Sequence, residues 1–140
     1  MGLLYQKLIK RTYILPSKDT RLTQEGKDIF GIKNERIFSI DEEIAWWHDC
    51  IYIHKLFINN IQDVINDDDP YILLEEDLRK LIEICKQIEI DSFVIKKFIL
   101  IDDNKIDYVE CINQIKQAKY ALENAILEIH EDCDLLYHGC

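Results

Sequence analysis

Polar side chains that can bind a ligand gather near the end of one predicted helix. His54 stands among apolar residues, and Asn60, Gln62 and Asp63 follow at the end of that segment. These groups suit hydrogen bonding to a small polar ligand better than hydrolysis, because no serine or cysteine stands in a recognisable nucleophile motif. A second interpretation stays open: His54 is a hydrogen-bonded core residue, and Asn60 and Asp63 only cap the helix and turn the chain.

Four potential zinc ligands lie close together near the C-terminus, namely His130, Cys133, His138 and Cys140. Zinc prefers tetrahedral sets of histidine nitrogen and cysteine sulfur, but structural zinc sites usually take their ligands from two separated turns. The spacing here matches no zinc class. No metal site is therefore predicted, and metal binding by this group stays open.

The acidic run that begins at Asp63 is expected to be a solvated turn. An EF-hand loop starting there would need glycine at its sixth position and glutamate at its twelfth, where this chain has Asp68 and Leu74. The chain also lacks the glycine-rich phosphate loops and the metalloprotease and serine-hydrolase motifs. We therefore predict a protein that is not an enzyme and has no cofactor.

A long central helix is expected to position the polar residues. Ser39 and Glu42 have the spacing of a capping box. Apolar residues then recur at helical spacing on two adjacent stripes. The pattern predicts a largely buried helix over about residues 41–61, with three core residues: Trp47, Ile51 and Phe57.

The remaining elements complete an α+β domain. Two further helices are predicted over about residues 75–88 and 107–130, the second with Leu122 in its core. Strands are predicted over residues 3–9, 36–40, 93–101 and 133–140. We therefore expect three helices packed on a small antiparallel sheet formed by the chain ends, in one domain covering residues 1–140.

Charge and composition restrict the partners. The 140 residues carry a formal net charge of −10, which disfavours nucleic acid and anionic membrane. Basic protein surfaces and small ligands held in a pocket remain. No apolar stretch is long enough to span a membrane, and no basic start leads into a long apolar run. The five cysteines form no CxxC pair, so we expect reduced thiols and an intracellular location.

The central segment resembles an uncharacterised family of small phage and prophage proteins. The resemblance rests on residues 40–57 (IDEEIAWWHDCIYIHKLF) and on the matching positions beyond them. The matching residues are Trp47, Ile53, His54, Phe57, Asn60, Gln62, Asp63 and Tyr71. The chain departs from the family at His48-Asp49, where the family has Arg-Lys, and at Ile51, where it has Asn. The resemblance implies a viral or mobile-element origin and gives no reaction.

Taken together, these features predict a viral accessory binding protein in the host cytoplasm. It would act against host defence by sequestering a host protein or a small signalling molecule. Its ligand site would consist of His54, Asn60, Gln62, Asp63 and Tyr71, the last added because it matches the family. The alternative is a structural or assembly protein of a virus particle or homo-oligomer, with Trp46 and Trp47 in subunit contacts.

Overall fold

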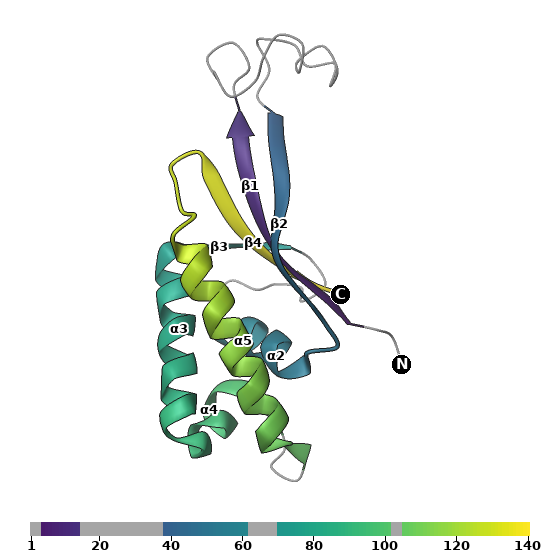
Figure 1. The fold of residues 1–140 in the computed structure, drawn as a ribbon, viewed down its shortest axis with the longest axis vertical. Helices are drawn as coiled ribbons and strands as arrows, with labels where there is room; N and C mark the ends of the chain where they lie inside the picture. The colour runs from purple at the N-terminus through teal and green to yellow at the C-terminus, as the bar shows by residue number, and fades with distance from the viewer. Residues whose placement is uncertain (1–3, 15–37, 62–69, 102–104) are drawn as a thin grey trace.

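The computed structural model describes residues 4–14, 38–61, 70–101 and 105–140. Within these ranges the chain forms both strands and helices (Figure 1). In chain order the elements are β1 (Tyr5–Ile14), β2 (Phe38–His48), α2 (Ile51–Asn60), β3 (Tyr71–Leu73), α3 (Glu75–Ile90), the 3-10 helix η1 (Ser92–Val94), α4 (Ile95–Ile99), α5 (Tyr108–Ile126) and β4 (Cys133–Gly139).

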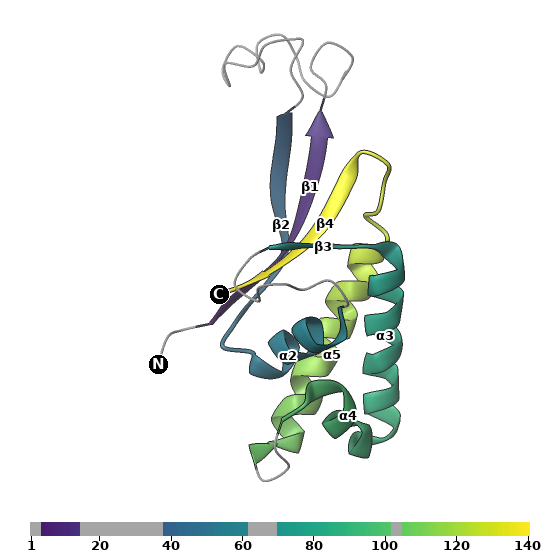
Figure 2. The ribbon, with the colours of Figure 1, turned by 180° about the vertical axis from the view of Figure 1, so that it is seen from behind.

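The strands that the structure describes form one antiparallel sheet in the order β2-β1-β4-β3. The two chain ends lie at its centre, because β1 pairs with β4 from Gln6 opposite Gly139 to Thr12 opposite Cys133. This confirms the predicted α+β class and the predicted pairing of the chain ends. The helices cover one face of the sheet, and the far half of the β1–β2 pair extends beyond them (Figures 1 and 2).

The prediction of a helix is wrong for the first half of the central segment. Residues 38–48 form strand β2, which pairs with β1 along its length with one irregularity. Cross-strand ion pairs support this pairing on the exposed face, where Lys7 binds Glu43 at 2.6 Å and Arg11 binds Asp41 at 2.8 Å. Pairing with a neighbouring strand thus overrides a helical pattern that was read from the local sequence alone.

Helix α2 begins only after a sharp turn. Asp49 takes the left-handed conformation with φ of 54°, and its carboxylate accepts the amide hydrogen of Leu4. The cap of α2 comes from another helix, since the Gln114 side chain of α5 accepts from the amide of Tyr52 at 2.9 Å. Ile51, at the start of the helix, is 42% exposed, so its predicted burial is wrong.

The run 93–101, which the sequence predicts to be β-rich, is helical up to Ile99 instead. Asp91 accepts the amide hydrogen of Phe93 and starts η1, which continues into α4. Ile95 and Ile99, one helical turn apart, are both fully buried, and Leu100 ends α4 with φ of 56°. The described residues therefore hold four α-helices rather than the predicted three.

The core lies between the sheet and the helices. Helices α3 and α5 pack side by side, with Leu81 and Leu122 among their fully buried residues. The ring of Tyr137 from β4 stacks on that of Phe57 from α2, with centroids 4.0 Å apart. Trp47, Phe57 and Leu122 are buried as predicted. Among the described residues, no helix is both long and apolar enough to cross a membrane.

Candidate functional site

His54 belongs to a buried hydrogen-bond network that joins α2 to the sheet. Its Nδ1 lies 2.8 Å from the hydroxyl of Tyr137, and His54 is only 7% exposed. The same hydroxyl lies 3.2 Å from Nε2 of Gln6 on β1. Gln6 also binds both main-chain groups of Cys50, donating to its carbonyl and accepting from its amide. The network therefore links β1, the start of α2 and β4.

The donor and acceptor roles in this network follow from the backbone. Of the two ends of the Gln6 amide, only the oxygen can accept the hydrogen of the Cys50 N–H. The amide oxygen therefore faces the Cys50 N–H, and the amide NH₂ lies toward the Tyr137 hydroxyl. The Tyr137 hydroxyl then accepts from Gln6 and has its own proton to donate to Nδ1 of His54. Burial also raises the pKa of Tyr137 well above its ordinary value, so the hydroxyl keeps that proton.

Gly139 allows the network to close. A Cβ added at this position would lie 2.6 Å from Nδ1 of His54 and 2.7 Å from the hydroxyl of Tyr137. Only glycine leaves room for both groups at this point of β4. The arrangement is that of a packed structural network whose side chains, Gln6, His54 and Tyr137, are buried.

The other predicted ligand residues that the structure describes are Asn60 and Tyr71, and they have different partners. Asn60 donates from Nδ2 to the carbonyls of Leu56 and Phe98, so it fastens α4 to the end of α2. Tyr71 on β3 contacts the Tyr137 ring, with centroids 5.6 Å apart. The structure thus brings His54 and Tyr71 to one shared neighbour and gives Asn60 different partners. Gln62 and Asp63 lie outside the described residues.

The four potential zinc ligands near the C-terminus are not gathered into a site. On β4, Cys133 pairs opposite Thr12 and His138 opposite Lys7, so the two lie on opposite faces of the sheet. Cys140 is exposed at the chain end. Within the described ranges, no group of three or more histidine, cysteine or acidic side chains is arranged to hold a metal ion.

The cysteines with resolved pKa shifts are poor nucleophiles. All five cysteines are free in the structure. Burial raises the pKa of Cys85 and of Cys111 to about 12, and it also raises that of Cys50. A raised pKa removes the thiolate that would react near neutral pH. These three thiols therefore act as packing residues.

The raised pKa values of the buried thiols predict that the protein loses stability in alkaline solution. The ordinary pKa of these thiols is 9.0, so in the unfolded chain Cys85 and Cys111 ionise near pH 9, whereas in the folded protein they stay protonated to about pH 12. The unfolded chain then binds fewer protons in this window, so the free energy of unfolding should fall as the pH rises from about 9 to 12. Urea denaturation at several pH values measures the slope.

Two variants test the cause of that slope. Replacing both Cys85 and Cys111 with alanine should make the fall shallower, although the residual slope from Tyr137 should remain. The Cys140→Ala variant, altered at an exposed thiol, should keep the full slope. Equal slopes in all three proteins would show that the buried thiols do not cause the effect.

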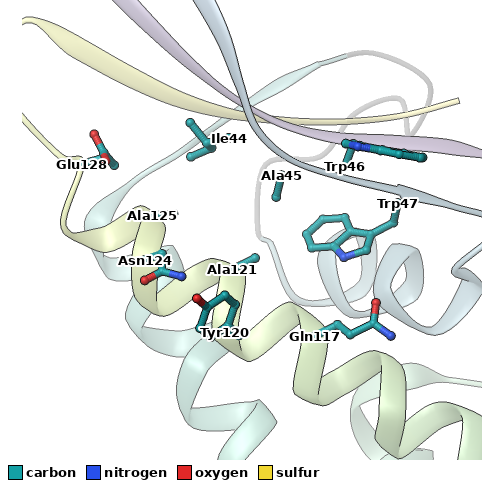
Figure 3. Close-up of a pocket in the computed structure, with 10 residues that line it drawn as sticks. All are labelled: Ile44, Ala45, Trp46, Trp47, Gln117, Tyr120, Ala121, Asn124, Ala125 and Glu128. Atoms are coloured by element: carbon teal, nitrogen blue, oxygen red, sulfur yellow. The ribbon is translucent and has the colours of Figure 1, made fainter.

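An open groove between β2 and α5 is the feature that the sequence analysis missed. It has a volume of about 500 Å³, and Figure 3 shows the side chains that line it. Trp46 is 65% exposed and Tyr120 is 73% exposed. The lining residues are Ile44, Ala45, Trp46, Trp47, Gln117, Tyr120, Ala121, Asn124, Ala125 and Glu128. The only signal for this surface in the sequence is the adjacent pair of tryptophans.

The lining of this groove, which we call the β2–α5 groove, is apolar with an acidic end. Among the described residues, the only charged one in its lining is Glu128, whose carboxylate binds Lys10 at 2.7 Å. This contact holds the pKa of Glu128 below its usual value, so the carboxylate is ionised at neutral pH. None of the sequence-predicted ligand residues that the structure describes lines the groove. Large exposed aromatic side chains beside an apolar hollow are typical of interaction surfaces.

Comparison of the chain with models of known protein families, with curated proteins and with solved structures finds no match.

Proposed function

We propose that this protein is a non-enzymatic binding protein that holds a polypeptide partner in the β2–α5 groove. The observation that carries the proposal is the exposure of Trp46 and Tyr120 on the two elements that form the groove. Tryptophan and tyrosine are enriched among the residues that dominate binding energy in protein interfaces. Together with the resemblance to phage proteins, this supports an accessory role in which the protein sequesters a host protein during infection.

The groove suits a polypeptide better than a small molecule. Small-ligand sites enclose most of the ligand and direct several polar groups at it. Among the described residues, the polar lining consists of Gln117 and Asn124 on α5 and of Glu128 just beyond its end, and the carboxylate of Glu128 is already bound to Lys10. The apolar part of the lining comes from both β2 and α5. Such a surface favours side chains presented along an extended segment.

An assembly role would use the same surface for contacts between copies of this chain. The net charge of −10 opposes such contacts, because every copy carries the same excess of negative charge. A foreign partner is therefore the better-supported occupant. Native mass measurement separates the two roles, since an assembly protein forms higher-order species without any partner.

Selection from a displayed random-peptide library tests the proposal. The wild-type protein should enrich a related set of peptides. A variant with Trp46→Ala and Tyr120→Ala should bind those peptides at least about tenfold more weakly, the effect of losing about 1.4 kcal/mol. Its melting temperature should stay close to that of the wild type, because both side chains are largely exposed.

A matched control variant also loses two exposed apolar side chains, but at positions outside the groove. Ile90, the last residue of α3, and Phe93 in η1 are also highly exposed and lie outside the groove. The Ile90→Ala, Phe93→Ala variant should bind the selected peptides as the wild type does. If the groove variant also binds them with unchanged affinity, the proposed site is wrong.

A further inference from the structure

Short side chains line the β2–α5 groove on both of its sides. Ala45 lies on the β2 side, and Ala121 lies on the α5 side (Figure 3). Larger rings, those of Trp47 and Tyr120, line the groove beside them. We infer, on the basis of the proposed function, that the partner inserts one large, uncharged side chain into this groove, and that Ala121 limits the size of that side chain.

The two alanines leave space between the sheet and α5. Ala45 pairs directly opposite Leu8, which is 1% exposed, so both lie on the face of the sheet that the helices cover. A methyl group from each side does not fill the space, and a hollow of about 500 Å³ remains. Pockets of this size hold a whole small molecule in other proteins. One large side chain, with the main chain beside it, therefore fits in the groove.

The charges around the groove favour an uncharged side chain. Among the described lining residues only Glu128 is charged, and its carboxylate is bound to Lys10 at 2.7 Å. The side chain of Lys10 is only 17% exposed, so the two charges satisfy each other. A charged side chain of the partner would lose its water against the apolar walls and gain no opposite charge in return, which is costly. An aliphatic or aromatic side chain meets no such cost.

The two rings favour a large side chain over a small one. Trp47 is 8% exposed and its ring lies against that of Phe57, with centroids 6.4 Å apart, so Trp47 forms a fixed wall of the groove. Tyr120 is 73% exposed, so a partner can cover most of it. The free energy gained by burial increases with the apolar area that is removed from water. Leucine, phenylalanine or tryptophan of the partner would therefore bind better here than alanine.

Two amide side chains are placed to bind the partner's main chain. Gln117 and Asn124 line the groove and are seven residues apart on α5, with Ala121 between them. Seven residues of α-helix measure about 10 Å, which is also the length of about three residues of extended chain. An amide group both donates and accepts hydrogen bonds, as does the peptide main chain. The inserted side chain would then come from the middle of an extended segment, between the two amide contacts.

The first test varies the inserted side chain. The probe is a peptide selected from the random library with the wild-type protein, and alanine substitution along it identifies the inserted residue as the position with the largest loss. Peptides with tryptophan, leucine, alanine or lysine at this position are then compared. The tryptophan or leucine peptide should bind at least about tenfold more tightly than the alanine and lysine peptides. A lysine peptide that binds as well as the leucine peptide would overturn the inference.

The second test makes the groove smaller. Ala121→Leu should weaken binding of the tryptophan peptide at least about tenfold, while the alanine peptide should bind as it does to the wild type. Asn113→Leu, at an exposed position of α5 outside the groove, should leave both affinities unchanged. Both variants should melt close to the wild type, because leucine is a good helix former and the open groove has room for the new side chain at position 121.

Ala45→Val gives a readout that does not depend on α5. It enlarges the residue on the β2 side, where valine suits a strand, and it should also weaken the tryptophan peptide more than the alanine peptide. Equal weakening of the two peptides by Ala121→Leu and by Ala45→Val would overturn the inference. Failure of the proposed function gives a different result. In that case the Trp46→Ala, Tyr120→Ala variant binds the library peptides as the wild type does, whereas failure of this inference alone leaves that variant's loss of binding in place.

Discussion

Replacing Trp47 with alanine should lower the free energy of unfolding by about 3–5 kcal/mol, as large truncations in a core do. Trp47 is buried on β2, and its ring lies against that of Phe57, with centroids 6.4 Å apart. Its removal would leave a cavity between the sheet and α2 that the stacked rings of Phe57 and Tyr137 could not easily fill. Chemical denaturation measures the change.

The neighbouring residue is the matched control for this prediction. Trp46→Ala removes the same side chain from the adjacent position, which is mostly exposed. It should change the free energy of unfolding by only about 0.5 kcal/mol. Similar losses in the two variants would contradict the strand assignment of residues 38–48, because a strand places the two tryptophans on opposite faces.

Gly139→Ala should destabilise the protein by about 1–3 kcal/mol, the usual cost of an added group in a packed interior. The new Cβ would fall within 3 Å of two network atoms, Nδ1 of His54 and the hydroxyl of Tyr137. Either ring would have to move, and the hydrogen bond between them would lengthen or break. Both side chains are buried, so neither ring can move without cost.

A double-mutant cycle isolates this effect from other consequences of the substitution. Two of the three atoms nearest to the new Cβ belong to His54. Combining Gly139→Ala with His54→Ala should therefore cost less than the sum of the two single changes. Strict additivity would show that Gly139 is not kept small by His54. Denaturation midpoints of the four proteins give the coupling energy.

The sequence predicted those helices and strands that can be identified from the pattern of neighbouring residues alone. Periodicity and turn residues predicted the strand at each chain end and the helices α3 and α5. The α+β class followed from them. Residues 41–48 were misread because Ile44 and Trp47 also fit a helical stripe, and because Ser39 and Glu42 imitate a capping box. Only the pairing with β1, a contact between distant segments, selects the strand.

The candidate site was less accessible to sequence reasoning for the same reason. His54 was correctly singled out as a residue that needs a polar partner, but nothing in its neighbourhood indicates that the partner is Tyr137 on the last strand. The β2–α5 groove depends on two elements far apart in the chain. The adjacent tryptophans indicated a contact surface in the sequence. Only the strand conformation shows which of them forms it, because it places one ring in the core and leaves the other exposed.

Amide chemical-shift mapping with a library-selected peptide tests the central claim most directly, because it locates the partner on the protein. The proposal predicts that shifts concentrate in residues 38–48 of β2 and 117–128 of α5 and its end, with the amides around His54 and Asn60 little changed. Shifts centred instead on His54, Asn60 and Tyr71 would contradict the proposal and would favour a ligand site at the end of α2.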